Sequence, residues 1–450
     1  MNRGTIMMLA IALGTAAGAW SMRPKDLPPA QFEDTGEALF PDFTDPAVAT
    51  ALTVVSWDED DAKVVRFAVE QKGGRWVIPS HNDYPADGTE RMGKAAASFI
   101  DVEKDVYYGD KVEDHARFGV LDPEGDEGKG DERGKRVTIK DASGTVLVDI
   151  IVGKEPEGKQ GFLYVRKPGE KRVYGAKLQL DISTDFGDWI EKDLLHVERD
   201  EIVQVAYDPY SVDEAQGKVV GSNPVVAELK MGEDGKEDWS ALEPTVAPEG
   251  KALDGAKVRQ MVTAAANVKI VGVRPRPEVL TLQALQSKGF FVTPDGRQLF
   301  GNEGQASLIT KDGIVYTLYF GEITFESGRA LTAGGPEEGT KDAAEGAEGE
   351  EGKTANRYMF VDVRYDATLD GEATKAPASP SEEEGEMGEE TPPAPPEVDE
   401  EAARKGAERA AKLRQRFDKW FYVISDASFK QIHKAPSELF KDLPAPSPEG

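Results

Sequence analysis

Short runs of β-branched and aromatic residues alternate with turn-forming residues along much of the chain. The first three runs, ALTVVSWD, KVVRFAVEQ and GRWVIP, are separated by the polar segments DEDDA and KGG. A period of two is typical of strands, because successive side chains point to opposite faces of a sheet. These runs predict a small antiparallel meander that begins near residue 48.

A helix and two further strand pairs are predicted after this meander. The segment ERMGKAAASFIDVEKDV follows Asp87-Gly88 and carries apolar residues at helical spacing. The hairpin RVTIKDASGTVLVDIIVG and the pair FLYVRK and KRVYGA come next, and DFGDWIEKDLL predicts a short helical corner. Residues 47–199 are therefore expected to form one α+β domain.

The same order of features recurs in residues 200–440. EIVQVAYD corresponds to ALTVVSWD, AKVRQMVTAAANVKIV to the first helix, and SLITKDGIVYTLYFG to the first hairpin. The corresponding residue pairs are Trp239 and Trp76, Asp254 and Asp87, Asp312 and Asp141, Gly321 and Gly153, and Trp420 and Trp189. This period far exceeds the roughly 20 to 50 residues of a solenoid repeat. The series predicts two tandem related domains, each an antiparallel meander with one main helix.

Two acidic insertions interrupt the second copy, at residues 333–356 and 366–397. Segments of such low hydrophobicity bury too little apolar area to offset chain entropy, so we expect both to be disordered. The segment EEAARKGAERAAKLRQRF then predicts a helix, and Trp420 to Ile424 predict the last strand. Residues 441–450 are expected to be a tail.

The N-terminus contains an uncharged apolar segment from Gly4 to Trp20. Its length is close to the minimum for crossing a bilayer, so residues 1–22 are predicted to be a transmembrane anchor or a signal peptide. Ala17-Gly18-Ala19 fits a cleavage site, whereas Trp20 suits an interfacial anchor. Residues 23–46 then predict an extended tether. We expect a single-pass protein of the cytoplasmic membrane with its bulk on the extracytoplasmic, periplasmic side.

The charge of the chain limits its partners. The formal net charge is −29 at pH 7, and there is no cysteine. A surface this acidic repels phosphate backbones, which argues against nucleic acid and anionic headgroups as general partners. The lack of cysteine excludes disulfides, thiol nucleophiles and thiolate metal sites.

The histidines form no recognisable catalytic or metal-binding motif. They are His81, His115, His196 and His433. No two of them lie one helical turn apart with a Glu between them, as a metalloprotease requires. Ser80-His81 lacks the Gly-x-Ser-x-Gly setting of an exposed nucleophile, and no glycine-rich segment ends in Gly-Lys-Ser/Thr. We expect surface or capping histidines, no cofactor, no catalytic residue and no enzymatic activity.

Two acidic clusters were candidates for a hard cation such as Ca²⁺: Asp58 to Asp61, and Asp122 to Asp131. The second departs from a calcium loop, because Glu127 replaces the glycine at position six and Arg133 stands where a bidentate Glu is required. Carboxylates in a hairpin turn are usually solvated and discourage edge pairing. We therefore expect no metal ligands in either cluster.

Four tryptophans offer a possible carbohydrate or peptide groove. They are Trp76, Trp189, Trp239 and Trp420. Their recurrence in both copies favours core packing instead, since packing constraints repeat with a domain and a single ligand site need not.

The series GRWVIPSHNDYPAD, a helix, HARFGVLDP, DIIVG, FLYVR, KRVYGA and FGDWIEKDLL resembles the bacterial family called domain of unknown function 4340. A tandem second copy behind an N-terminal membrane segment is also similar to members of that family. The resemblance covers residues 48–210 well and the second copy loosely. Phe118 to Pro123 departs from the family's Tyr-Gly-Leu-Asp-x-Pro stretch by one additional residue.

The resemblance implies an accessory role and supplies no catalytic residues. Members of the family are similar to envelope proteins that accompany ABC-type export or gliding-associated transport components. We therefore expect a non-enzymatic accessory or scaffold protein with protein partners in an envelope transport complex. The alternatives are a module that binds an extracellular polymer or Ca²⁺ and, third, a hydrolase whose site the sequence does not reveal.

Overall fold

The computed structural model describes most of the chain between residues 34 and 443. The described ranges are 34–59, 62–125, 128–180, 182–231, 236–277, 279, 281–326, 328–333, 355–371 and 399–443. The predicted membrane segment at 1–22 and the first part of the predicted tether lie outside these ranges. Within the described ranges, no helix is both long and apolar enough to span a bilayer.

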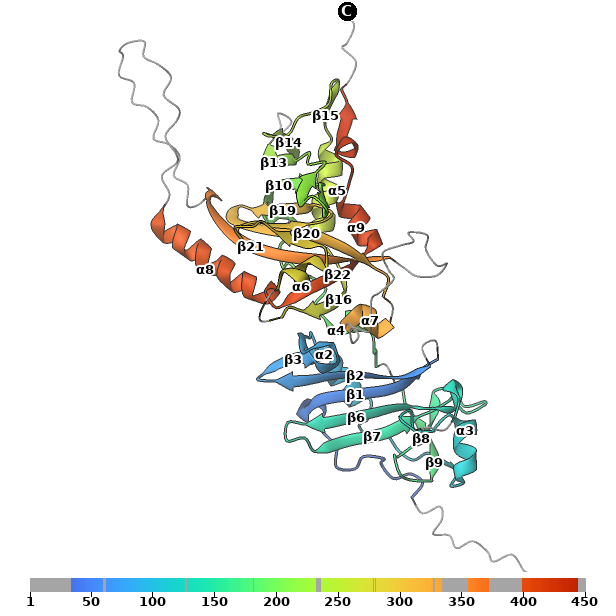
Figure 1. Cartoon of the computed structure of the whole chain (residues 1–450). Coiled ribbons are helices and arrows are strands. Elements are labelled where there is room, and N and C mark those ends of the chain that lie inside the picture. The colour runs from blue at the N-terminus through green and yellow to red at the C-terminus, as the bar shows by residue number, and fades with distance from the viewer. Residues whose placement is uncertain are drawn as a thin grey trace, which may run out of the picture. The chain divides into compact units, whose positions relative to one another are not determined.

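Internal contacts divide the chain into two compact units. Unit 1 comprises Met1–Arg66 and Met92–Ile182, and unit 2 comprises Phe67–Arg91 and Ser183–Gly450. The sheets are mainly antiparallel and the helices few, which confirms the predicted α+β class (Figure 1). The domain boundaries predicted at 47–199 and 200–440 remain predictions.

The first sheet has nine strands in the order β4-β3-β2-β1-β6-β7-β8-β9-β5. Its strands are β1 (Ala49–Asp58), β2 (Lys63–Lys72), β3 (Arg75–Ile78), β4 (Tyr84–Pro85), β5 (Val106–Gly109), β6 (Lys135–Asp141), β7 (Val146–Val152), β8 (Phe162–Arg166) and β9 (Val173–Lys177). The α-helices in this part of the chain are α2 (Thr89–Ala97), α3 (His115–Phe118) and α4 (Phe186–Trp189).

The second sheet has eight strands in the order β14-β13-β10-β19-β20-β21-β22-β16. Its strands are β10 (Ile202–Asp208), β13 (Val225–Met231), β14 (Glu237–Leu242), β16 (Ile270–Pro275), β19 (Gln305–Thr310), β20 (Asp312–Thr324), β21 (Asn356–Asp370) and β22 (Trp420–Ser425). Short pairs are formed by β11 (Ser211–Asp213) with β12 (Lys218–Val220), β15 (Lys251–Leu253) with β23 (Phe440–Asp442), and β17 (Phe290–Val292) with β18 (Leu299–Gly301). The helices are α5 (Gly255–Ala266), α6 (Leu282–Gln286), α7 (Gly328–Ala333), α8 (Glu400–Phe417) and α9 (Asp426–Ile432).

The second sheet buries apolar side chains on both faces. Tyr319 and Phe320 are neighbours in β20 and therefore point to opposite faces. Phe320 packs edge-on against Phe429 of α9, with ring centroids 5.3 Å apart. Tyr319 joins a cluster on the other face, whose buried members are Leu285, Phe290, Phe360 and Phe421. Each aromatic ring of this kind removes roughly 150–250 Å² of surface from water, so the two faces supply much of the stability of this sheet.

The first sheet has a smaller cluster of the same kind. Ile151 of β7 packs with Phe118, Val120 and Val173, and Tyr108 and Tyr164 lie against them. The Phe118 and Tyr164 ring centroids are 4.6 Å apart.

The strand orders of the two sheets agree strand for strand once β4 is set aside. The first sheet then reads β3-β2-β1-β6-β7-β8-β9-β5, and the second reads β14-β13-β10-β19-β20-β21-β22-β16. The registers agree as well. Across β7, β8, β9 and β5 the partners are Val152, Val165, Tyr174 and Tyr107. Across β20, β21, β22 and β16 they are Phe320, Met359, Tyr422 and Val273.

One close backbone contact joins a short helix to the first sheet. Helix α3 ends at Phe118 and is capped by Gly119, whose φ of 68° lies in the left-handed region that glycine tolerates best. The Lys154 amide donates to the Phe118 carbonyl at 3.0 Å. A Cβ on Gly153 would lie 2.4 Å from that same carbonyl oxygen, so the approach requires a glycine.

The second sheet repeats this contact after α6. Gly289 has a φ of 75°, and the Glu322 amide donates to the Lys288 carbonyl at 2.9 Å. A Cβ on Gly321 would lie 2.2 Å from the Lys288 carbonyl oxygen. The predicted pairing of Gly321 with Gly153 thus coincides with one shared backbone geometry.

A buried arginine reinforces each of these junctions. Arg166 donates twice to the Val120 carbonyl, at 2.9 and 2.8 Å, and Arg357 donates to the Gly321 carbonyl at 2.7 Å. Burial lowers the pKa of both guanidinium groups, because a low-dielectric surrounding disfavours their charge. The carbonyl oxygens that they contact partly offset this cost.

Two predicted helices are too long. Helix α2 ends at Ala97, and α5 ends at Ala266, where the Asn267 side chain donates to the Thr263 carbonyl at 2.9 Å. The residues beyond each helix form the strands β5 and β16 after a short connection. Both strands pair with distant partners, β9 and β22, and that tertiary pairing overrides the local helical pattern.

The limits of the predicted insertions also need correction. Strand β21 continues to Asp370, which pairs with Asp312, so residues 366–370 belong to the strand and are not part of a disordered insertion. The Tyr365 hydroxyl donates to the Asp370 carboxylate at 2.8 Å and holds this end of the strand. Ala333 and Asn356 likewise belong to α7 and β21. The rest of both predicted insertions, residues 334–354 and 372–397, lies outside the described residues.

The predicted equivalence of Trp420 and Trp189 is wrong. Trp420 begins the strand β22, whereas Trp189 ends the short helix α4. Because Tyr422 and Tyr174 hold corresponding register positions, the counterpart of Trp420 is Arg172. Lys419 to Ile424 therefore corresponds to KRVYGA, and the counterpart of α4 in chain order is α9.

We expect Gly153→Ala and Gly321→Ala each to lower the free energy of unfolding by about 1–3 kcal/mol, because the added methyl group clashes with a fixed carbonyl. Urea denaturation followed by circular dichroism measures the loss. Gly93→Ala is the matched control, since no atom lies within 4 Å of its added Cβ and it stands inside α2. A loss as large in the control, or none at Gly153 and Gly321, would contradict the assignment.

Candidate functional site

Two of the four histidines are buried and hydrogen-bonded. His81 lies 3.0 Å from Ser80 Oγ through Nδ1 and 2.9 Å from Thr332 Oγ1 through Nε2. Its ring stacks on Phe186 at 4.5 Å between centroids. His115 Nε2 donates to the Lys171 carbonyl at 2.8 Å. Both rings are buried and held by these contacts.

The other two histidines follow α4 and α9. His196 lies on the surface beside the Glu191 carboxylate. His433 stacks on Phe429 at 4.6 Å and meets the edge of Tyr207. Its Nε2 is buried and has no hydrogen-bond partner among the described residues. The structure thus brings no two histidines into one site within the described chain.

Burial lowers the pKa of His433, and the nearby positive charge of Arg357 lowers it further. The Arg357 guanidinium lies 4.1 Å from the centre of the Phe429 ring, on which His433 also stacks. The second sheet therefore keeps the imidazole neutral at a pH where an unfolded chain already protonates it.

We expect unit 2 to lose stability as the pH falls below about 6.5, the usual histidine pKa. His433 then binds a proton in the unfolded chain but not in the folded state, so protonation favours unfolding. His433→Gln removes this group and should weaken the pH dependence below about pH 6.5. Urea denaturation at several pH values measures it, and an unchanged dependence in the variant would refute the role of His433.

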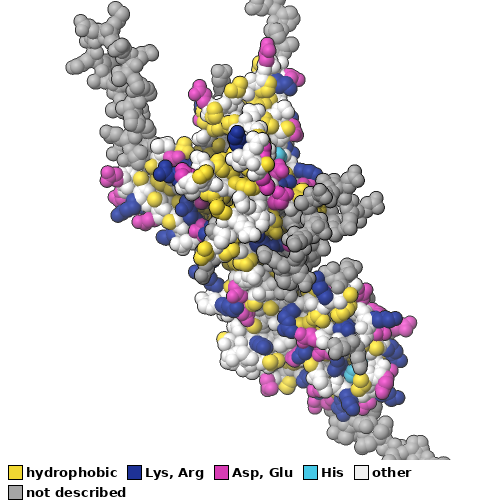
Figure 2. Space-filling model, in the orientation of Figure 1, with side chains coloured by type: hydrophobic (Ala, Val, Ile, Leu, Met, Phe, Trp, Pro, Cys, Tyr) yellow, Lys and Arg dark blue, Asp and Glu magenta, His cyan; other side chains and the backbone are white. Residues whose placement is uncertain are grey.

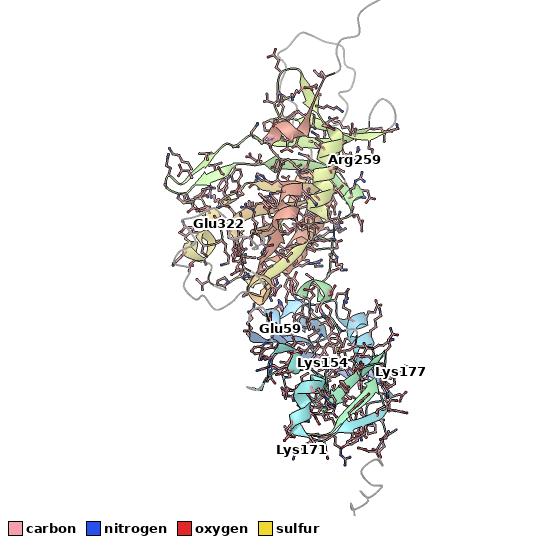
Figure 3. All side chains as sticks on the ribbon, turned by 90° about the vertical axis from the view of Figure 1, so that its right-hand side faces the viewer. Glu59, Lys154, Lys171, Lys177, Arg259 and Glu322 are labelled. Carbon is pink, nitrogen blue, oxygen red and sulfur yellow. The ribbon has the colours of Figure 1, made fainter. Side chains whose placement is uncertain are left out.

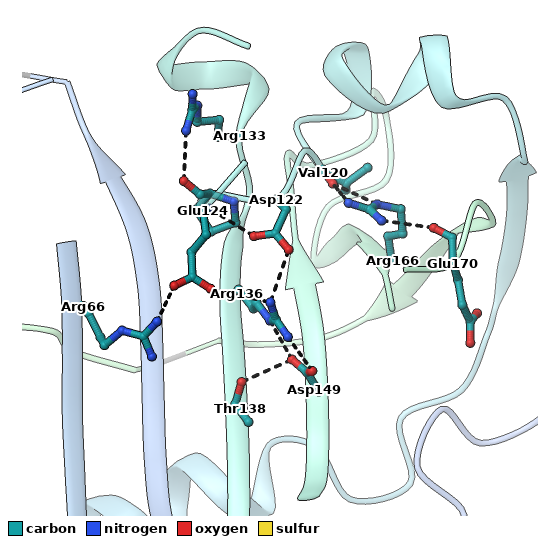
Figure 4. Close-up of polar contacts among 11 residues, drawn as sticks. Arg66, Val120, Asp122, Glu124, Arg133, Arg136, Thr138, Asp149, Arg166 and Glu170 are labelled. Atoms are coloured by element: carbon teal, nitrogen blue, oxygen red, sulfur yellow. Dashed lines mark hydrogen bonds and ion pairs between the residues drawn. The ribbon is translucent and has the colours of Figure 1, made fainter. Parts of the chain in front are cut away.

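The acidic loop that begins at Asp122 is tied to cations of the same unit (Figure 4). Arg136 pairs with Asp149 at 2.8 Å, Asp122 at 3.3 Å and Glu124 at 3.7 Å. Arg66 also pairs with Glu124. The side-chain hydrogen bond to Asp149 raises the pKa of Arg136. These carboxylates are therefore occupied by arginine and are not arranged around a metal.

Other parts of this loop are also held by protein groups. Lys154 pairs with Asp131 at 2.9 Å, and Arg133 donates to the Pro123 carbonyl at 2.9 Å. The Arg133 guanidinium lies over the Trp57 ring at 4.1 Å. Asp60, Asp61, Asp126 and Glu127 lie outside the described residues. In the part of the chain that the structure describes, no group of three or more His, Asp or Glu could hold a metal ion.

We expect Ca²⁺ at millimolar concentration to leave the melting temperature unchanged, because Arg136, Arg66 and Lys154 already neutralise the carboxylates of the Asp122 loop. Differential scanning fluorimetry with Ca²⁺ and with a matched ionic strength of NaCl tests this. A saturable rise in melting temperature with Ca²⁺ alone would show that the loop binds the cation.

Three of the four tryptophans of the expected core set are buried. Trp189, Trp239 and Trp420 are at most 7% exposed, and Trp76 is half-buried. Trp189 donates its indole N–H to the Ser183 carbonyl at 2.8 Å. Buried rings cannot stack on a sugar, so these three tryptophans do not form a carbohydrate platform.

A pocket of about 230 Å³ in unit 1 contains a carboxylate among cations. We call Asp34, Lys104, Arg172 and Tyr174 the Asp34 cluster. Asp34 Oδ2 accepts hydrogen bonds from the Tyr174 hydroxyl, from Arg172 at 3.0 Å and from Lys104 at 3.4 Å. Burial alone would raise the pKa of Asp34, but Tyr174 and the two cations outweigh it and lower the pKa. Burial also raises the pKa of Tyr174 to about 12, so its hydroxyl stays a donor.

A basic groove runs between α5 and α9 in unit 2, on the face that Figure 3 turns toward the viewer. Two adjoining depressions, of about 310 and 750 Å³, share Gln260, Ala264 and Gln431 in their linings. Their charged lining residues are Arg199, Lys257, Arg259, Lys269, Lys434 and Glu438. On the visible face of each unit in Figure 2, by contrast, blue and magenta side chains are interspersed.

Sequence reasoning missed the basic groove and the Asp34 cluster. A signal existed for the groove, since α5 carries Lys257 and Arg259 and contains no Asp or Glu. The Asp34 cluster left no local signal, because Asp34 is separated from Arg172 and Tyr174 by about 140 residues along the chain.

Residues 76–288 match the family described as Domain of unknown function (DUF4340). This part of the chain is a DUF4340 domain. The resemblance inferred from the strand motifs is thereby confirmed at the level of the family. No curated protein and no solved structure matches the chain.

The DUF4340 match starts within β3 and ends shortly after α6. It therefore includes the Gly153 contact, the cluster around Ile151 and all of α5. Helix α9, the other wall of the basic groove, lies beyond it.

Proposed function

We propose that this protein is a non-enzymatic, membrane-anchored accessory or scaffold protein of an ABC-type envelope transport system. In this proposal residues 1–22 anchor it in the cytoplasmic membrane, residues 23–33 form the tether, and the two sheets lie on the extracytoplasmic side. The tether predicted at residues 23–46 is too long, because Leu39 and Phe43 are buried in unit 1. The apolar segment from Gly4 to Trp20 supports the anchor. The partner class rests on what the sequence resemblance to domain of unknown function 4340 proteins implies, an association with envelope transport components.

We further propose that the two sheets arose by tandem duplication. The agreement in strand order across eight strands supports this, since a coincidence would have to reproduce every crossover. The strand registers through Tyr174 and through Tyr422 also match, which adds independent support. So does the shared geometry of Gly153 and Gly321.

The non-enzymatic proposal rests on which features the two sheets have in common. The repeated features are packing features: a glycine against a carbonyl, and an aromatic cluster on one face of the sheet. Histidines, in contrast, are absent from every described strand of both sheets. Two rigid supports of this kind suit a docking scaffold, whereas a single catalytic site would need only one.

The alternative, a module for an extracellular polymer or Ca²⁺, has less support. The carboxylates of the Asp122 loop pair with arginine and lysine, and Trp189, Trp239 and Trp420 are buried. A sugar platform or a calcium loop would need these groups exposed and unpaired.

Cross-linking in intact membranes, followed by affinity purification of the tagged full chain, tests the proposal. We expect the permease subunit of an ABC transporter to be enriched over a control purification from membranes that carry an unrelated tagged single-pass protein. Deleting residues 1–22 should release the chain from the membrane and abolish the enrichment. Recovery of the full chain from membranes with no transporter subunit would refute the transport association.

A further inference from the structure

The basic groove is formed where small residues of α5 face α9. Gln260, Ala264 and Asn267 follow one another at helical spacing on the exposed side of α5, and Val258, Met261 and Val262 point into the core. Ala256 and Ala264 leave room beside Gln431 and Ser428 of α9. The hollow is therefore a property of two helices that are themselves fixed, because Phe429 of α9 is buried against the second sheet.

The charge of the groove is opposite to that of the chain. Its lining contains five cationic side chains and one carboxylate, whereas the whole chain carries −29. Arg259 is paired with Asp238 at 3.1 Å. The other four cations form no ion pair within the described chain; they are Arg199, Lys257, Lys269 and Lys434. These four cations outnumber the one carboxylate of the lining, Glu438, and so leave a positive potential that a ligand anion can neutralise.

We propose that the groove between α5 and α9 binds an extended acidic peptide segment of a partner protein, with carboxylates at alternate positions. Lys257 and Lys434 receive carboxylates at one end, and Lys269 and Arg199 at the other. Gln260, Gln431 and Asn267 present amide donors and acceptors suited to a peptide backbone. The proposal does not depend on the transport association, since any partner with such a segment would fit.

The dimensions set the length of the segment. Helix α5 has 12 residues and is therefore about 18 Å long. An extended peptide advances about 3.3 Å per residue, so five or six residues cover the groove. Side chains at alternate positions then lie about 6.6 Å apart on one face, which places several carboxylates along the row of cations.

The lining distinguishes a peptide from other polyanions. It contains no aromatic side chain, so neither sugar rings nor nucleic-acid bases find a stacking surface. The acidity of the rest of the chain also repels a long nucleic acid. A short peptide avoids that repulsion because it contacts the groove alone.

Fluorescence anisotropy with the full chain tests the proposal. The probe is a fluorescein-labelled peptide of about six residues with Glu at alternate positions, and the control probe carries Gln in place of Glu. We expect saturable binding of the Glu probe that weakens with added NaCl, and at least tenfold weaker binding of the Gln probe.

Charge reversal locates the site. The double variant Lys257→Glu and Lys434→Glu should weaken binding of the Glu probe at least tenfold. The matched control is Lys140→Glu and Lys177→Glu, which changes the net charge equally on exposed residues of unit 1. Both double variants should keep the wild-type melting temperature, because none of the four lysines forms an ion pair with another described residue.

Three results would overturn the proposal. They are no binding of the Glu probe at low salt, equal weakening in the two double variants, and displacement of the probe by heparin or single-stranded DNA at lower concentrations than unlabelled Glu peptide. The last result would assign the groove to a sulfated or phosphorylated polymer. Loss of the transport association alone would leave these measurements unchanged.

Discussion

The fold depends on a single backbone contact that occurs once in each sheet. A glycine lies so close to the carbonyl oxygen of a short helical segment that no side chain fits between them, at Gly153 and again at Gly321. The contact sets the position of the chain after α3 and after α6, and so directs Val120 and Phe290 into the apolar clusters. Protein interiors are close-packed and tolerate little displacement. The positions of Val120 and Phe290 therefore determine where the neighbouring aromatic rings can pack. Arg166 and Arg357 hold the neighbouring carbonyls and make the junction rigid.

The two units share these rigid glycine junctions and differ in the side-chain contacts made elsewhere on their sheets and helices. In the second sheet, Phe320 and Phe429 hold α9 beside α5, and the cations of the basic groove line the hollow between these two helices. Side chains at equivalent ladder positions can thus take different partners in the two units without disturbing the sheets. Tyr174 and Tyr422 illustrate this, because they share a ladder position, yet one donates to Asp34 and the other packs near Phe417.

The strands could be predicted from the sequence because their signal is local. Alternation in ALTVVSWD, in RVTIKDASGTVLVDIIVG and in YMFVDV coincides with β1, with β6 and β7, and with β21. The helix Glu400–Phe417 was also predictable, since Ala, Glu, Lys and Arg dominate it. Strands β5 and β16 were not, because their pairing with β9 and β22 is decided by partners far away in the chain.

The same distinction applies to the sites and to the repeat. Local motifs predict no metal ligand among the histidines and acidic clusters, and this stays a prediction. Within the described chain the carboxylates around Arg136 are paired with it. The basic groove arises from two helices separated by about 160 residues, so no single segment reveals it. Trp420 was misplaced because one aromatic residue after a helix resembles another until the register of β22 is known.

The Asp34 cluster determines where a pulling force on the N-terminal segment enters the protein. Asp34 precedes β1 by 15 residues of sequence, yet it is bonded to Tyr174 of β9 and to Arg172 and Lys104. Tension applied from the N-terminal side is therefore borne first by these side-chain bonds and not by the end of β1. The load is thus divided between several side-chain bonds before it reaches the hydrogen-bonded ladder of the first sheet.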